Sequence, residues 1–267
     1  MPGPILRERP VLVAPDSFKG TLRASEVAGA IGRGLERAGL MPPDLCPVAD
    51  GGQGTTDALL PALGGEIVAA PLGRAVPGSF ALLEDGGTAL VEDTGAASSS
   101  YWMGELVCAA VDAGAKVILV APDGSDDGAG ALRAIAEHGG IGGARLVLLC
   151  HGDLRTELWA AQGAVLEPGA RWILDALGFD DRMRAARAVV TGEGRLDSHT
   201  LTGSVVGEIG QRTRQAGVPL HAVVGTADLD LFGRRMIDLQ RVLEATTLEA
   251  LEAAGEQLGS DLADGRA

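Results

Sequence analysis

The chain has 267 residues, of which 46% are hydrophobic and 22% charged, which is ordinary for a globular protein with a buried core. Its formal net charge of −14 repels nucleic-acid backbones and anionic membrane surfaces, so we expect no nucleic acid and no membrane among its partners. No stretch is long enough for a membrane span, the first residues lack the apolar run of a signal peptide, and the three cysteines show no disulfide or zinc spacing. These features predict a cytoplasmic protein.

The first predicted elements alternate between strand and helix. They are a buried strand at 11–14, a helix at 25–38 and a helix at 57–63. Short apolar segments then follow at 66–69, 79–83 and 88–92. The sequence Asp85-Gly86-Gly87 separates the last two of these segments, and an Asp-Gly pair at such a place predicts a tight antiparallel hairpin.

The rest of the chain continues the alternation. Further strands are predicted at 116–121, 145–150, 188–191 and 220–224, and further helices at 104–113, 130–138, 171–177, 181–186, 205–216 and after 247. Strands that alternate with helices indicate a doubly wound parallel sheet, in which ligands bind at the carboxyl ends of the strands. The polar, Gly-rich segments of this chain follow its predicted strands, so we expect them at that edge.

The first such segment follows the strand at 11–14 and contains Asp16, Ser17 and Lys19. A loop with a lysine can hold a phosphate group while the next helix offers its free N–H groups. The Walker pattern GxxxxGK[ST] is absent. A polar turn that only caps the helix is an equally good interpretation of this segment alone.

The second segment, Asp50–Asp57, contains three glycines that allow main-chain amides to approach an anion closely. Asp50 is suited to hold Mg²⁺ or a substrate hydroxyl. The alternative is a flexible turn closed by an Asp cap. The third segment, Asp123–Gly130, has three aspartates among its glycines, which suggests a metal or phosphate loop, although a solvated acidic loop is as good an interpretation.

The fourth segment, Thr191–Ser198, follows a Val-Val strand. Arg195 can bind a carboxylate or a phosphate, and Asp197 can accept a proton. The alternative is that Arg195 and Asp197 form a pair at the surface. The four histidines form no catalytic triad and have no metal-ligand spacing.

Three of these segments together resemble a known family. The sequences VAPDSFKG at 13–20, PVADGGQGT at 47–55 and TGEGRLD at 191–197 are similar to motifs of bacterial glycerate kinases, in the same order. The resemblance extends from Val11 to about Gly225. It implies a Rossmann-like α/β fold with a doubly wound parallel sheet and a smaller inserted α+β domain. The implied Rossmann-like domain is discontinuous (1–65, 99–140 and 171–267), and the reduced inserted domain takes 66–98 and 141–170.

The resemblance further implies a kinase that phosphorylates glycerate with ATP and Mg²⁺. We expect Lys19, Asp197 and Asp16 to be catalytic, with Lys19 in contact with phosphate and Asp197 as the base. Asp50 and Asp127 are the expected metal ligands. The expected substrate- and phosphate-binding residues are Ser17, Asp50, Gly51, Gly52, Gly54, Thr55, Gly124, Ser125, Asp127, Gly192, Glu193, Gly194 and Arg195.

The chain also departs from the family pattern. Gln53 stands where the family usually has Glu, Gly203-Ser204 replaces a Gly-Lys pair, the third motif is shortened, and a family segment expected after Cys150 is missing. These departures keep two alternatives open. One is a non-catalytic relative that binds a nucleotide or a hydroxy acid. The other is a different small-molecule transferase on the same scaffold. A homodimer is also left open.

Overall fold

The computed structural model describes residues 9–72, 77–93, 100–122, 124, 127–151 and 155–266. The chain forms two compact units, each with its own sheet. Unit 1 consists of Met1–Ala49 and Leu174–Ala267, and unit 2 consists of Asp50–Ile173.

Unit 1 contains a five-stranded sheet of order β13-β11-β9-β1-β2, in which every pair of neighbours is parallel. Its strands are β1 (Val11–Pro15), β2 (Asp44–Leu45), β9 (Ala188–Gly192), β11 (Leu220–Val224) and β13 (Leu239–Glu244). Its helices are α2 (Ala24–Arg37), α8 (Phe179–Ala185), η1 (Ser198–Leu201), α9 (Val205–Ala216), α10 (Leu231–Met236) and α11 (Leu248–Asp264). Two short strands, β10 (Arg195–Leu196) and β12 (Thr226–Ala227), form a separate parallel pair.

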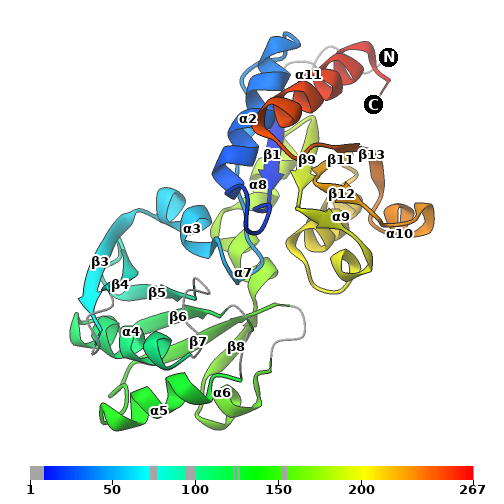
Figure 1. The fold of residues 1–267 in the computed structure, drawn as a ribbon. Coiled ribbons are helices and arrows are strands. Elements are labelled where there is room, and N and C mark those ends of the chain that lie inside the picture. The colour runs from blue at the N-terminus through cyan, green and yellow to red at the C-terminus, as the bar shows by residue number, and fades with distance from the viewer. Residues whose placement is uncertain are drawn as a thin grey trace. The chain divides into compact units, whose positions relative to one another are not determined.

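Helices cover both faces of this sheet. Figure 1 shows α2 and α11 side by side, and their apolar residues share one core with Val11 and Val13 of β1 and Val190 of β9. Because side chains alternate between the faces of a strand, these residues define one face. Helix α9 contacts β9 and β11 and is buried through its own apolar stripe. The predicted doubly wound parallel sheet is therefore confirmed in unit 1.

The contact between α2 and α11 depends on glycine. A Cβ atom added at Gly34 would overlap the carbonyl oxygen of Glu252 and lie 2.6 Å from the amide nitrogen of Glu256. The main chains of the two helices therefore touch at this point. The carboxylate of Glu252 also pairs with Arg33 at 3.0 Å and with Arg37, which adds charged contacts between the helices.

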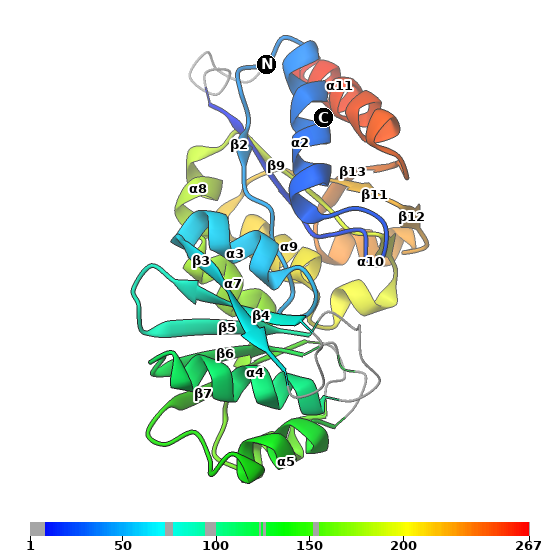
Figure 2. The ribbon, with the colours of Figure 1, turned by 60° about the vertical axis from the view of Figure 1, so that its left-hand side comes forward.

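Unit 2 contains a six-stranded mixed sheet of order β3-β4-β5-β6-β7-β8. Its strands are β3 (Gly65–Pro71), β4 (Pro77–Leu83), β5 (Thr88–Glu92), β6 (Val117–Ala121), β7 (Arg145–Cys150) and β8 (Val165–Pro168). Its helices are α3 (Thr55–Leu63), α4 (Tyr101–Asp112), α5 (Ala129–Glu137) and α6 (Glu157–Ala161). The boundary between unit 2 and unit 1 falls within helix α7 (Gly169–Ala176). Figure 2 shows α4 and α5 together on this sheet, and residues of both helices share its apolar core.

The first three strands of unit 2 are antiparallel, and those from β5 to β8 are parallel. The predicted hairpin is confirmed: β4 and β5 pair antiparallel, and the Asp85 carboxylate accepts hydrogen bonds from the Gly87 and Thr88 amides at 2.9 and 2.8 Å.

The division into units differs from the expected domain boundaries. We expected 99–140 to belong with the first strand and 66–98 to belong to an insertion. Instead β6 pairs with β5, so these two segments share the sheet of unit 2, and the segment 50–65 joins them. The reason is that the pairing of a strand depends on the packing of the whole sheet, and the local sequence pattern of 117–121 does not specify which strand lies next to it.

No helix in the described part of the chain is long and apolar enough to cross a membrane.

His221 is the second residue of β11 and is fully buried, and neither of its ring nitrogens has a hydrogen-bond partner in the described part of the chain. Burial, and then the positive charge of Arg241, lower the pKa of His221 from 6.5 to about 4, against the opposing charge of Asp261. The unfolded chain therefore binds a proton near pH 6.5 that the folded chain accepts only near pH 4.

We expect the free energy of unfolding to fall between pH 6.5 and pH 4 by about 3 kcal/mol because of His221. His221→Leu removes the titrating group at similar volume, so this part of the acid destabilisation should disappear. Urea unfolding of both proteins at a series of pH values measures the difference. If the free energy of unfolding changed equally with pH in wild type and variant, His221 would not be the cause of the acid destabilisation.

Candidate functional site

The carboxyl end of β1 carries the first predicted segment. Asp16 and Ser17 are buried there, and Lys19 is exposed. The Asp16 carboxylate accepts a hydrogen bond from the Ser17 amide at 2.6 Å, and the Asp16 amide donates to the Gly192 carbonyl oxygen at 2.8 Å. The Ser17 hydroxyl is buried and has no hydrogen-bond partner in the described part of the chain. A buried hydroxyl without a partner is costly, and a ligand oxygen would satisfy it.

The carboxyl end of β9 carries the fourth segment and lies beside the first. Pro15 of β1 and Gly192 of β9 are register partners in a parallel pair, so the residues after them leave the sheet at the same edge. A Cβ atom added at Gly194 would lie 3.4 Å from the Phe18 Cα and 3.7 Å from the Lys19 amide nitrogen. The structure therefore brings the PDSFKG and TGEGRLD segments together within unit 1.

Glu193, Thr200 and Asp197 form a connected network after β9. The Thr200 hydroxyl donates to the Glu193 carboxylate at 2.6 Å and accepts from the Asp197 amide at 3.1 Å. The Asp197 carboxylate accepts from the His199 amide at 2.8 Å and so caps η1. These bonds fix the orientation of both carboxylates at the edge of the sheet.

Arg195 is also at this edge, but it pairs with Asp228 at 2.9 Å. The alternative of a surface pair between Arg195 and Asp197 is therefore wrong. To bind a substrate carboxylate as predicted, Arg195 would have to exchange Asp228 for it. The guanidinium is mostly exposed, so this exchange has a low desolvation cost.

The second segment lies in unit 2, across the ends of β7 and β8. A Cβ atom added at Gly51 would lie 3.0 Å from the Leu149 Cβ and 2.9 Å from the Gly169 Cα. Gly51 has a φ of 103°, which favours glycine as well. Asp50 is buried at the start of this loop, and its carboxylate accepts from the Gly52 amide at 3.1 Å. The Thr55 hydroxyl donates to the Gly52 carbonyl oxygen at 2.6 Å.

Glu92, at the end of β5, is a residue that sequence reasoning did not assign to the site. Its carboxylate accepts from the Gly54 amide at 2.7 Å and from the Thr56 amide at 2.6 Å, at the amino terminus of α3. An anion is favoured there by the helix dipole, and Glu92 supplies it. The Gly52 and Gly54 amides thus donate to carboxylates of the chain itself, so phosphate binding by these amides would require both bonds to be exchanged.

His151 is the second residue that sequence reasoning passed over. It follows β7, and its Nε2 lies 2.8 Å from the Pro122 carbonyl oxygen at the end of β6. The signal that could have found it is its position directly after a predicted buried strand, where ligand-binding residues of α/β sheets gather.

The third segment is described only in part, because Asp123, Ser125 and Asp126 lie outside the described residues. Gly124 is described and exposed. The Asp127 carboxylate accepts from the Ala129 amide at 3.1 Å, at the start of α5. No group of three or more His, Cys, Asp or Glu residues in the described ranges is arranged to hold a metal ion. The assignment of Asp50 and Asp127 as metal ligands therefore stays a prediction.

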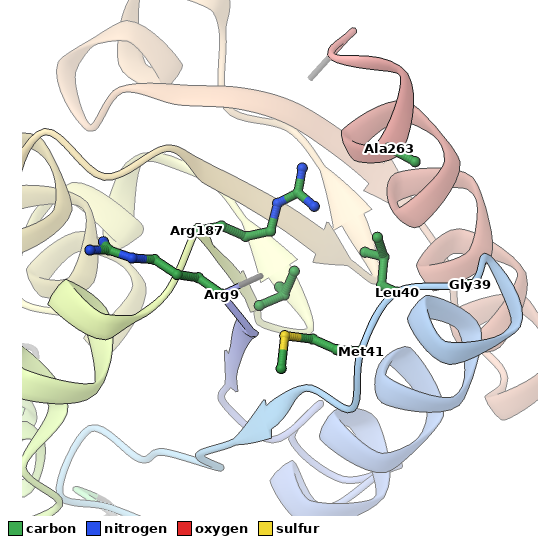
Figure 3. Close-up of a pocket in the computed structure, with 7 residues that line it drawn as sticks. Arg9, Gly39, Leu40, Met41, Arg187 and Ala263 are labelled. Atoms are coloured by element: carbon green, nitrogen blue, oxygen red, sulfur yellow. The ribbon is translucent and has the colours of Figure 1, made fainter. Parts of the chain in front are cut away.

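A cavity of about 190 Å³ lies at the sheet of unit 1, on the side opposite to the carboxyl ends of β1 and β9. Figure 3 shows Leu40 and Met41 at this cavity, with the guanidinium groups of Arg9 and Arg187 pointing in different directions. The Arg187 guanidinium donates to the Leu262 carbonyl oxygen at 2.8 Å. Since Val11 begins β1, the cavity is at the amino end of the strands and apart from the four predicted segments.

The fold and these loops define an α/β protein with polar, Gly-rich turns at the carboxyl ends of parallel strands, where this class binds its ligands. The sequence profile of the glycerate kinase family matches residues 11–139 and 151–262, and the chain belongs to this family.

Individual relatives agree with this placement. The chain is 33% identical over 203 residues to a glycerate kinase of Bacillus subtilis. This alignment covers 67% of the present chain and 49% of the Bacillus subtilis protein, so it spans about half of that relative. It is 26% identical over 325 residues to a glycerate kinase of Halalkalibacterium halodurans, which covers 81% and 85%. That alignment is longer than the chain, so the relative has positions without a counterpart here. The fold is similar to the crystal structure of a Salmonella typhimurium LT2 protein described as a candidate glycerate kinase 2, with a TM-score of 0.73, 21% identity and coverage of 97% and 99%.

Proposed function

We propose that this protein is a kinase that transfers the terminal phosphoryl group of ATP to a hydroxyl group of glycerate. The observation that carries the proposal is the adjacency of the PDSFKG and TGEGRLD segments at one sheet edge, in a chain of the glycerate kinase family. Such an enzyme would work in the cytoplasm, where ATP is available.

The residues of unit 1 fit the binding of a phosphorylated ligand. The Ser17 hydroxyl is buried and lacks a partner, as expected where a ligand oxygen completes the hydrogen bonding. Lys19 is exposed two residues after Ser17, so it can bring a positive charge to the same ligand. Phosphoryl transfer depends on positioning and on neutralisation of charge more than on covalent chemistry by the protein, and these are the contributions that Ser17 and Lys19 can make.

The carboxylates after β9 are the candidates for handling the acceptor hydroxyl. We assign Asp197 as the base that accepts its proton, with Glu193 held in place by Thr200. Asp16 lies at the neighbouring strand end, where its main-chain amide is anchored to Gly192. Arg195 would bind the glycerate carboxylate once it leaves Asp228.

Asp50 and Asp127 are the proposed ligands of Mg²⁺. Carboxylate oxygens suit this ion, which in kinases is usually held by one or two carboxylates together with substrate phosphates. When bound, Mg²⁺ neutralises part of the phosphate charge. The Asp50 carboxylate is buried and oriented by the Gly52 amide, so it is ready to serve as such a ligand.

A coupled assay that follows ADP release with ATP, Mg²⁺ and glycerate tests the proposal. We expect turnover by the wild type and a fall in kcat of about 100-fold in Asp197→Asn. Asparagine is as good a helix cap as aspartate, so the variant keeps the cap of η1 and loses only the charge.

Asp181→Asn is the matched control, because the Asp181 side chain is 97% exposed on α8. It should behave as wild type. Absence of wild-type turnover, together with a rise in melting temperature on addition of ATP or glycerate, would replace the kinase with the non-catalytic binding protein. Faster turnover of another hydroxy acid or sugar acid would instead indicate a different transferase.

A further inference from the structure

Helix α10 carries the two most exposed large apolar side chains in the described part of the chain. Leu231 and Phe232 are each 72% exposed, and Met236 is 48% exposed. Since successive residues of an α-helix are about 100° apart, these three side chains and the exposed Arg235 share one continuous face of about 140°. We call it the outer face of α10. A continuous apolar patch commonly marks a binding surface, whereas single exposed apolar residues do not.

The opposite face of α10 is fixed to unit 1, so the outer face cannot turn inward. Gly233 is buried, and a Cβ atom added there would lie 2.5 Å from the Leu229 side chain. Ile237, which directly follows the helix, is buried against α9, because a Cβ atom added at Gly210 would lie 2.6 Å from the Ile237 Cβ. The Arg234 guanidinium donates to the Leu229 carbonyl oxygen at 2.9 Å. Figure 1 shows α10 at the periphery of unit 1, next to β13.

The charges along α10 make its outer face complementary to a second copy of itself. Asp230 caps the amino end, where its carboxylate accepts from the Gly233 amide at 2.7 Å, and Arg235 lies in the last turn. A twofold axis perpendicular to the helix places two copies antiparallel, so that Arg235 of each copy lies toward Asp230 of the other. The dipoles of the two helices are then also opposed, which is the favourable arrangement.

The size of the outer face determines how strong such an association can be. Three apolar side chains are few compared with the about 20–30 residues that each partner contributes to a stable interface, so we expect weak association. Two copies with a net charge of −14 also repel each other at low ionic strength. This repulsion is screened in about 0.3 M salt, where the Debye length is about 6 Å.

We propose that two copies of this protein form a weak dimer through the outer faces of their α10 helices, which lie antiparallel about a twofold axis. Leu231, Phe232 and Met236 of the two copies pack against one another, and Arg235 of each copy fixes the orientation by its attraction to Asp230 of the other. The inference is independent of the proposed kinase function, because none of these residues is assigned to the candidate site.

Sedimentation equilibrium of the full chain at about 10 µM to 1 mM in about 0.3 M NaCl tests the proposal. We expect the wild type to follow a monomer–dimer equilibrium with a dissociation constant of about 100 µM. The double substitution Leu231→Gln with Phe232→Gln should raise this constant at least about tenfold, because both apolar contacts are lost in each copy. Both side chains are exposed, so the variant should fold, and circular dichroism checks that it does. Arg235→Glu places like charges opposite Asp230 and should raise the constant about threefold.

Two matched controls lie in unit 2. Leu158→Gln removes an apolar side chain that is 41% exposed on α6, and Lys116→Glu changes the net charge by the same amount as Arg235→Glu. Both should retain the wild-type dissociation constant. A wild type that stays monomeric throughout, or a double variant that dimerises as the wild type does, would overturn the inference. Species larger than a dimer would overturn the twofold arrangement, and equal dissociation constants for Arg235→Glu and Lys116→Glu would overturn the antiparallel orientation. Absence of kinase turnover would leave the dimer untouched.

Discussion

Replacement of Lys19 by methionine should lower kcat/KM for ATP by about 100-fold or more, the usual cost of losing one charged contact in a phosphoryl-transfer site. The chain has only two lysines, and its net charge is −14, so a triphosphate meets a repulsive overall field. The Lys19 main-chain amide lies beside Gly194 at the shared edge of β1 and β9, so its side chain starts from the loop where the proposed phosphate site needs a positive charge. Because the side chain is exposed, its loss should not unfold the protein.

The second lysine provides the control for this experiment. Lys116 is exposed just before β6, at the amino end of the strands of unit 2. Lys116→Met changes the net charge of the protein by the same amount as Lys19→Met. It therefore measures how much of the effect on kinetics comes from the net charge alone. We expect it to retain wild-type kinetics, and Lys19→Arg to retain part of the activity. Equal activity of Lys19→Met and Lys116→Met would exclude Lys19 from the site.

Gly34→Ala is expected to lower the stability of the protein strongly. The added methyl group would overlap the Glu252 carbonyl oxygen and crowd the Glu256 amide, which are main-chain atoms of α11 and cannot move away singly. Overpacking of a core usually costs about 1–3 kcal/mol, and contact with main-chain atoms places this case at about 3 kcal/mol. Chemical denaturation followed by circular dichroism measures the loss.

Gly29→Ala is the matched control in the same helix. A Cβ atom at Gly29 would meet only the end of the Arg33 side chain, at 3.5 Å. Alanine favours helix over glycine by about 1 kcal/mol, so this variant should be as stable as wild type or more stable. If both variants lost stability equally, the close approach of α2 and α11 would not exist in solution.

Local patterns predicted most of the elements of this fold. The strand at 145–150 and the helix at 205–216 have the predicted bounds, because their apolar periodicity and their flanking glycines are clear. The strand β13 was not predicted, because none of its residues is fully buried and its apolar pattern is weak. The short strand β2 has only two residues, too few to carry a pattern.

The candidate site was predicted in part. The motifs identified the loops after β1 and β9, and the parallel pairing of these strands follows from the α/β pattern. The contact between Glu92 and the Gly54 amide joins residues 38 positions apart, and the bond between His151 and Pro122 joins residues 29 apart. Such contacts depend on which strands become neighbours in the folded sheet, and the spacing of residues within one segment does not predict which strands these are.

The pairing of α2 with α11 has a consequence for biosynthesis. The apolar side of α2 is covered by α11, which leaves the ribosome only after the whole of unit 2 has been made. Unit 2 is one continuous stretch and can fold while translation continues, whereas unit 1 must wait for α11. During that delay β1 and α2 expose apolar surface, so the nascent segment from β1 to α2 is where a chaperone would be expected to bind.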